Sequence, residues 1–308
     1  MRAPMGVDGP RRPARHPVIT LFLVAAGLAV SWMAAGCSQP VAGAGAPDSA
    51  APPVHPPPGP AAPLRLATFN IRWGLGADGV RDLTRTAAVL RAMDADIVLL
   101  NEVDVHWRRS GNKDQPAYLA QAAGYPYMYF GPALRTWASG GPRLSLYGNL
   151  LLSRYPLQDA RTIALPTGPG REPRAAVAAR VVVGGRTLTV LGTHLGLNQA
   201  ERLLQTARLR ELAAGQPGPV VVMGDFNARP GAPEIQQLTA GPGGLVDTHQ
   251  VAGAGPGLTF PAGQPAARID YVFVSPDLAS LVLRASPWPT LASDHLPVVV
   301  DLAWPQAP

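Results

Sequence analysis

The chain has 308 residues, of which 47% are hydrophobic and 15% are charged. This composition is typical of a globular protein and argues against an intrinsically disordered chain. The formal net charge is +6, but four arginines and one aspartate within residues 1–36 supply half of this excess. The charge of the remaining chain is only a weak argument for a nucleic-acid partner.

Residues 1–36 have the pattern of a secretory signal. Four arginines precede an apolar run at 18–35, which ends in small residues before position 37. A positively charged segment, an apolar segment and small residues before a cleavage point are typical of such signals. The apolar run is also long enough to cross a membrane, so an uncleaved anchor is the alternative.

Cys37 is the only cysteine and directly follows Ala34-Ala35-Gly36. This arrangement resembles a bacterial lipobox, in which the cysteine becomes the lipidated first residue of the mature protein. Position 34 departs from the pattern, because Ala stands where Leu is more frequent. We expect a lipidated Cys37 to hold the protein on the extracytoplasmic face of the cell membrane. A free thiol in a helix is the alternative, and a disulfide within the chain is excluded.

The segment 37–63 is predicted to be a linker. From residue 40 onward it consists mainly of Pro, Ala and Gly, with almost no large apolar side chain. Such a segment cannot bury a core and favours extended polyproline geometry. We interpret it as a semi-stiff tether that precedes one domain at 64–308, a size that a single core can fill.

The domain contains short apolar segments that we predict to be strands. Their β-branched residues and their Gly or Pro boundaries favour strand over helix. The predicted strands are 64–71, 96–102, 148–153, 178–184, 186–195, 219–226, 268–275 and 295–303.

Two segments between these strands have the spacing of amphipathic helices, 82–93 and 198–212. In the second, Asn198 and Glu201 have the spacing of an N-terminal capping box. The residues predicted to face inward from this helix are Leu204, Ala207, Leu209 and Leu212. Because two strands follow each other directly at 178–195, an all-parallel sheet is disfavoured. The sequence predicts an α/β (α+β) domain in which two packed mixed sheets are flanked by helices.

The stretch VVVMGDFNAR at 220–229 ends a buried strand with an acid and an amide. Side chains alternate along a strand, so Asp225 and Asn227 would share a face while Phe226 turns into the core. A carboxylate and an amide side by side can bind a hard metal ion or a phosphate group. An ordinary turn before Pro230 and Gly231 is the structural alternative.

Similar polar residues end or begin other predicted strands. Each of them alone is compatible with a cap, a turn or a satisfied buried side chain, but four of them are carboxylates. Carboxylates gathered at strand ends would repel one another unless a cation offsets the cost. Oxygen ligands of this type suit Mg²⁺ or Mn²⁺. The candidate residues are Asn70, Glu102, His194, Asp225, Asn227, Asp270, Asp294 and His295.

These motifs resemble the endonuclease/exonuclease/phosphatase superfamily, which includes deoxyribonuclease I-like nucleases, neutral sphingomyelinases and inositol polyphosphate phosphatases. The resemblance extends over roughly residues 65–303. It implies a four-layer αββα sandwich with its active site at one edge of the two sheets, and metal-dependent hydrolysis of a phosphate ester. The motifs occur in the family's order: ATFNIRWG, DIVLLNEVD, GNLLLSRYP, GTHLG, VVVMGDFNARP, TFPAGQPAARIDYVFVS and ASDHLPVVVDL.

The resemblance also implies a role for each metal-binding candidate. Glu102 matches the principal metal ligand, with Asn70 beside it, and Asp294 would support the metal. After Asn70 the chain reads Arg72-Trp73, where several relatives have His; this departure concerns substrate contacts and not the metal.

The catalytic roles follow in the same way. His295 would be the general base, oriented by Asp270, although Asp225 is a rival for that role. Asp225 and Asn227 would position the attacking water and a phosphate oxygen, and His194 would hold or protonate a non-bridging phosphate oxygen.

The substrate stays open between three hypotheses. The first is a phosphodiesterase or phosphatase that acts on a lipid head group or small phosphate ester at the cell envelope. The second is a secreted nuclease, and the third is a lipoprotein that binds without catalysis. The segments 104–117 and 132–145 are expected to be loops over the site. Loop residues that could grip a substrate are Trp107, Arg108, Arg109, Arg135, Trp137 and Arg143. We expect a monomer.

Overall fold

The computed structural model describes residues 63–137 and 143–305. The predicted signal segment, Cys37 and the predicted linker up to residue 62 lie outside these residues and stay predictions. Among the helices in the described part, none is long and apolar enough to cross a membrane.

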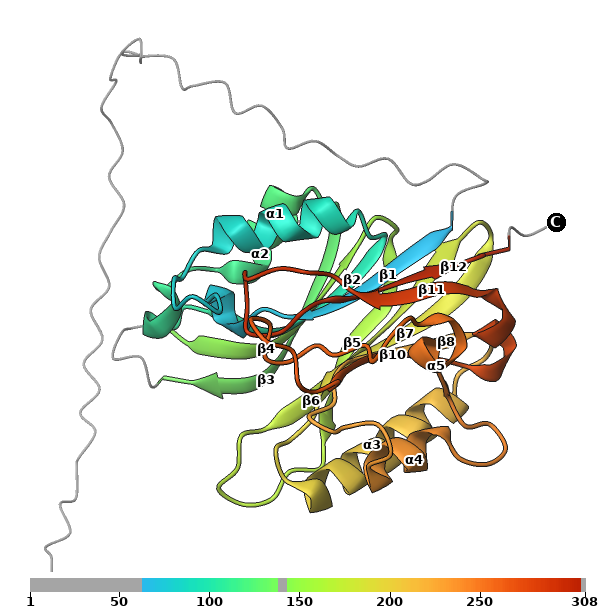
Figure 1. The fold of residues 1–308 in the computed structure, drawn as a ribbon. Helices are drawn as coiled ribbons and strands as arrows, with labels where there is room; N and C mark the ends of the chain where they lie inside the picture. Colours follow the sequence, from blue (N-terminus) through green and yellow to red (C-terminus); the bar gives the residue numbers. More distant parts are fainter. Residues whose placement is uncertain (1–62, 138–142, 306–308) are drawn as a thin grey trace, which may run out of the picture. The chain divides into compact units, whose positions relative to one another are not determined.

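Two six-stranded sheets make up the centre of the described part (Figure 1). The first sheet has the order β11 (Val282–Pro287), β12 (Val298–Leu302), β1 (Leu64–Asn70), β2 (Ile97–Val105), β4 (Ser145–Ser153) and β3 (Tyr127–Thr136). The second has the order β5 (Leu157–Leu165), β6 (Arg174–Val183), β7 (Arg186–His194), β8 (Val220–Asp225), β10 (Asp270–Val274) and β9 (Val246–Asp247). Among these described strands, β1–β2 and β7–β8 pair in parallel and the other neighbours are antiparallel.

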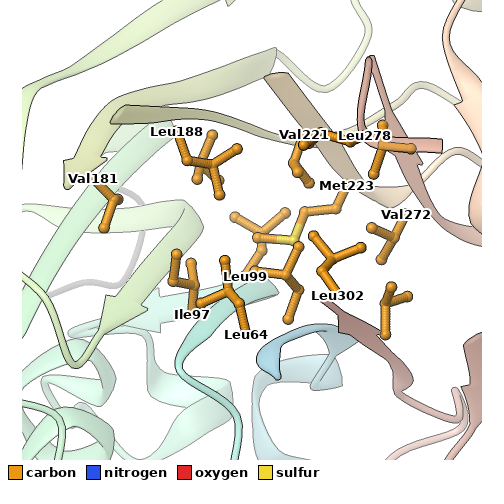
Figure 2. Packing of buried hydrophobic residues seen from close by; sticks show 14 of the residues in the cluster. Leu64, Ile97, Leu99, Val181, Leu188, Val221, Met223, Val272, Leu278 and Leu302 are labelled. Carbon is orange, nitrogen blue, oxygen red and sulfur yellow. The ribbon is translucent and has the colours of Figure 1, made fainter. Parts of the chain in front are cut away.

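Three apolar clusters hold four layers together. The largest fills the space between the sheets, with Leu99 of β2 and Met223 of β8 among its members (Figure 2). A second cluster lies under the helices that cover the first sheet, and a third under those that cover the second. The helices are α1 (Leu83–Met93), α2 (Gln115–Ala123), α3 (Gln199–Ala214), α4 (Pro233–Thr239) and the short α5 (Thr248–Ala252). The predicted sandwich of two mixed sheets flanked by helices is confirmed.

The strands that the sequence analysis missed are β3, β5, β9 and β11, and each lies at the edge of its sheet. Edge strands are half-exposed, so they lack the continuous apolar run that marks a buried strand. The predicted loops were also too long. Residues 132–136 belong to β3, and 104–105 belong to β2.

The inward face of α3 also differs from the prediction. Leu204 is 60% exposed, whereas Gln205 is fully buried. Gln205 accepts from the Gly196 N–H at 2.9 Å and donates to the Pro166 carbonyl at 2.8 Å, which offsets the burial of its amide. Asn198 caps the helix as predicted, but the Glu201 carboxylate accepts from the Gly168 N–H instead of completing a capping box.

A pair of buried amides ties the two sheets together at one edge. Asn101 of β2 donates to the Asn149 side chain of β4 at 2.8 Å and to the Thr193 carbonyl of β7 at 2.9 Å. Its oxygen accepts from the Asp225 N–H at 3.0 Å, and Asn149 donates to the Ala175 carbonyl of β6 at 2.9 Å. Because every partner is buried, these bonds fix the relative position of the two sheets.

Replacing Asn101 should therefore destabilise the fold. Asn101→Ala leaves several buried groups without partners, and we expect a loss of about 3 kcal/mol in the free energy of unfolding. Urea unfolding of the variant beside Gln121→Ala, an exposed amide on α2, measures the difference. A loss below about 1 kcal/mol would show that the amide pair does not hold the sheets together.

Candidate active site

Three of the predicted site residues form a row across neighbouring strands. His194 of β7 is in register with Asp225 of β8, and Asp225 is in register with Asp270 of β10. All three are buried, and His194 Nε2 lies 3.4 Å from Asp225 Oδ2. Gly224 permits this close approach, because a Cβ there would come within 1.8 Å of the Thr193 carbonyl oxygen and its φ is +146°.

Glu102 reaches the row from the first sheet through an irregularity in β2. The pairing of β2 with β4 shifts between Leu100 and Val103, and Glu102 has a φ of 59°. Such a bulge interrupts the alternation of side chains, so Asn101 can enter the buried amide pair while its neighbour Glu102 lines the site. The left-handed conformation costs roughly 1–3 kcal/mol for a non-glycine residue and is often found at functional sites.

Asn70, at the end of β1, joins the acids of the two sheets. Its amide nitrogen donates to Glu102 Oε1 and to Asp225 Oδ2, both at 3.0 Å. Its oxygen accepts from the Arg72 N–H at 3.0 Å. Asn70 therefore holds Glu102 and Asp225 at a fixed separation.

His295 completes the site from the loop before β12. Its Nδ1 lies 2.9 Å from Asp270 Oδ2, and its ring packs against Phe260 with 4.8 Å between centroids. Its Nε2 faces Asp225 Oδ2 at 3.8 Å, which is too long for a direct hydrogen bond. Asp270 thus orients the ring and leaves Nε2 directed at Asp225.

The remaining predicted residues lie at the same edge. Asp294 pairs with Arg72 at 3.3 Å. The Asn227 N–H donates to Asp225 Oδ1 at 2.9 Å, and its side chain donates to the Leu195 carbonyl at 3.0 Å. The structure brings the predicted residues together, while the role of each stays a prediction.

Burial and crowding shift the pKa values of these groups. Burial raises the pKa of Glu102. Burial, and then the charge of Asp270, raises the pKa of Asp225 to about 7. For His295, burial alone would lower the pKa, but the carboxylates of Asp270, Asp225 and Asp294 outweigh it and raise the pKa. The two groups also affect each other, because the charge of His295 opposes the rise in the pKa of Asp225 and the charge of Asp225 contributes to the rise in the pKa of His295.

The donor set fits a divalent cation. Asp225, Asp270 and His295 offer ligand atoms that lie within 4.8 Å of one another, and Glu102 is bridged to Asp225 by Asn70. Asp270 Oδ1 is a buried atom with no hydrogen-bond partner among the described residues. Carboxylate oxygens are the preferred ligands of hard cations such as Mg²⁺ and Mn²⁺.

Arg174, the first residue of β6, was not predicted as part of the site. It is buried, and its Nη1 lies 3.1 Å from His194 Nδ1 and 2.7 Å from Glu172 Oε1. Burial, then the charges of Arg174 and His295, lower the pKa of His194 well below its usual value. In the sequence, Arg174 stands shortly before the predicted strand 178–184 and gave no other signal.

Two of the residues predicted to contact a substrate also have structural roles. Arg109 forms two hydrogen bonds with the buried Asp104 carboxylate, at 2.9 and 2.8 Å, and stacks on the Trp107 ring at 4.9 Å. The Trp107 indole N–H donates to the Leu146 carbonyl at 2.7 Å. These contacts brace the loop beside Glu102, although the Arg109 side chain stays 40% exposed. For four other loop residues, contact with a substrate stays a prediction. Their side chains are exposed: Arg108, Arg135, Trp137 and Arg143.

Comparison with known proteins gives consistent results. The sequence profile described as the Endonuclease/Exonuclease/phosphatase family matches residues 67–295. The chain is 31% identical over 253 residues to the uncharacterized protein YbhP of Escherichia coli K12, covering 78% of this chain and 96% of YbhP.

Solved structures show the same fold. An endonuclease/exonuclease/phosphatase from Beutenbergia cavernae is 28% identical, with a TM-score of 0.61, over 80% of this chain and 73% of that protein. The Bacteroides thetaiotaomicron mannosyl-6-phosphatase Bt3783 is 18% identical, with a TM-score of 0.61, over 78% of this chain and 100% of its own. The human Nocturnin catalytic domain, with bound sulfate, is 21% identical, with a TM-score of 0.59, over 78% of this chain and 93% of its own.

Proposed function

The chain belongs to the endonuclease/exonuclease/phosphatase family, and from its site we propose that it hydrolyses phosphate esters with the help of a divalent cation. We further propose a phosphodiesterase or phosphatase that acts at the cell envelope on a lipid head group or a small phosphate ester. The observation that carries the proposal is the row of His194, Asp225 and Asp270, which His295 joins from one side and Glu102 from the other. The structural neighbours at 18% and 21% identity share the fold, so the proposal rests on this chain's own site.

Glu102 and Asp294 are the residues we propose to hold Mg²⁺ or Mn²⁺, with Asn70 fixing Glu102 in place. When bound, such a cation neutralises charge on the phosphate oxygens and lowers the pKa of water. A cation would also offset the crowding of buried carboxylates that raises the pKa values of Glu102 and Asp225.

His295 and Asp225 are proposed to move the proton of the attacking water. Asp270 accepts from His295 Nδ1, so Nε2 is the nitrogen that faces the reacting atoms. The charged imidazolium is favoured by the surrounding carboxylates, and Asp225 is the carboxyl whose pKa is raised toward neutrality. Transfer of a proton between Asp225 and His295 leaves the total charge of the pair unchanged. The two candidate bases are therefore two protonation forms of one pair.

The expected location favours a substrate at the membrane. The arginines before the apolar run favour an inside N-terminus, and a lipid on Cys37 would explain why the one cysteine lies where it does. The Pro-rich segment after it would give the domain a reach of about 3 Å per extended residue. With little net charge left after the first 36 residues, the nuclease hypothesis ranks second.

A substrate panel with added Mg²⁺ tests the proposal. We expect hydrolysis of sphingomyelin vesicles, phosphoinositides or the probe bis-p-nitrophenyl phosphate to exceed that of plasmid DNA and RNA, and to stop when EDTA removes the metal. Preference for DNA or RNA would favour the nuclease. Absence of hydrolysis across the panel would favour the binding lipoprotein.

In the same assay, Glu102→Gln should lose activity by at least about 100-fold, because a principal charge in the site is gone. Its metal-free melting temperature should not fall, since the amide still accepts from Asn70 and no longer carries a buried charge. Glu211→Gln, on the exposed face of α3, is the matched control. A Glu102→Gln protein as active as the parent across a Mg²⁺ titration would refute this assignment.

The base assignment predicts unequal losses. His295→Ala should lower the rate by about 10²–10⁴-fold, the usual contribution of general acid–base catalysis. Asp270→Asn should cost less, because the ring loses its orienting charge but keeps its nitrogen. Steady-state rates measure both, with His249→Ala of α5 as the control. If Asp270→Asn were the slower enzyme, the assigned roles would be wrong.

The lipid anchor predicts the behaviour of Cys37→Ser. The parent, extracted in detergent, should have the intact mass of a chain that begins at a lipidated Cys37. The Cys37→Ser protein should lose this modification and, if cleaved, leave the membrane, whereas Ser38→Ala should behave as the parent. A Cys37→Ser protein that is cleaved after Gly36 and still membrane-bound would contradict lipidation.

A further inference from the structure

Arg174 and His194 meet on neighbouring strands of the second sheet. Arg174 opens β6 and His194 closes β7, and the two strands pair in register from Ala176 and Thr193 onward. The Arg174 guanidinium lies 3.1 Å from His194 Nδ1, with both side chains buried. The Glu172 carboxylate pairs with the same Nη1 at 2.7 Å, so one guanidinium nitrogen contacts both the carboxylate and the ring.

The chemistry of this contact determines where the His194 proton lies. A guanidinium has N–H donors and no acceptor, and it is not deprotonated in proteins. His194 Nδ1 must therefore present its lone pair to Arg174. A ring with acceptors at both nitrogens would be an imidazolate, so Nε2 must carry the proton.

Nε2 faces one acceptor and one donor. Asp225 Oδ2 lies 3.4 Å away and can only accept from it when ionised. The Asn227 amide nitrogen lies nearer, at 3.1 Å, and donates one of its two hydrogens to the Leu195 carbonyl at 3.0 Å. As a donor it opposes a proton on Nε2, whereas the Asp225 carboxylate and the Arg174 guanidinium on the other side of the ring favour one. A ring that was protonated at Nδ1 instead would place two N–H groups against each other at the Arg174 contact.

We propose that Arg174 is a positioning residue that locks His194 in the neutral Nε2–H form, so that His194 serves as a hydrogen-bond donor to a phosphate oxygen and not as a proton donor. A second proton on Nδ1 is blocked while Arg174 donates there, and release of the Nε2 proton would leave an imidazolate. A neutral imidazole that donates without transferring its proton is an established catalytic device.

This inference narrows the role that the resemblance left open for His194, which was to hold or to protonate a non-bridging oxygen. It leaves His295 and water as the groups that exchange protons. The contact with a phosphate oxygen rests on the proposed function, whereas the form of the ring does not.

Nitrogen NMR of the full chain, with ¹⁵N-labelled histidine, tests the form of the ring in magnesium-free neutral buffer. The His194 signals are identified by their loss in His194→Gln. We expect a non-protonated Nδ1 and a protonated Nε2 in the parent. Arg174→Met should populate both neutral forms or the doubly protonated ring, and Arg174→Lys should restore the parent pattern because an ammonium also only donates. Arg180→Met, on the same strand, is the control.

A parent ring protonated at Nδ1 would overturn the proposal even if Arg174→Met failed to fold. So would a folded Arg174→Met protein with an unchanged ring. Titration with inorganic phosphate should shift the Nε2–H signal in the parent, and no shift would reject the phosphate contact alone. With bis-p-nitrophenyl phosphate as substrate, Arg174→Met should lower kcat about 10- to 100-fold. A purely structural role would instead lower the melting temperature without changing the ring signals.

Discussion

The position of the whole site depends on the buried amide of Asn101. Its side chain bonds to its own sheet through Asn149 and to the opposite sheet through the Thr193 carbonyl and the Asp225 N–H. Apolar packing between sheets is not directional, so it does not by itself set which residues face each other across the interface. Hydrogen bonds from the Asn101 amide to two strands of the other sheet do determine which residues face each other. Through them, the strand end that carries Asp225 is held against the strand that carries Glu102.

This arrangement places several carboxylates close together in a buried region, which costs free energy. Neighbouring side chains of the site partly offset that cost. Asn70 separates Glu102 from Asp225, His295 lies between Asp225 and Asp270, and Arg72 reaches Asp294. Even so, the pKa values of Glu102 and Asp225 are raised, which means that part of the repulsion and desolvation is left uncompensated. A site that is costly without a cation and favourable with one is what we expect of a metal-dependent hydrolase.

Many of the strands and site residues could be predicted from local sequence patterns. The relative positions of the site residues depend on strand order, which such patterns do not give. Interior strands such as β8 were found because both of their faces are buried, while the edge strands β3, β5, β9 and β11 were missed. The site residues were found because each is a polar residue at the end of an apolar strand. The register that aligns His194, Asp225 and Asp270 is set by pairing across distant segments, which no local pattern encodes. Arg174 was missed for that reason, and Arg109 was assigned to substrate because its stacking on Trp107 was not visible in the sequence.

A crystal structure of the protein soaked with Mn²⁺ and inorganic phosphate tests the central claim most directly, because anomalous scattering locates the metal without reference to activity. We expect one strong peak beside the carboxylates of Glu102 and Asp294, with a phosphate oxygen against His194 Nε2. A map with no metal peak at this edge of the two sheets would contradict the proposed metal site. A metal that lay only among Asp225, Asp270 and His295 would also contradict the proposal. Asp225 and His295 would then be metal ligands and could not serve as the acid–base pair.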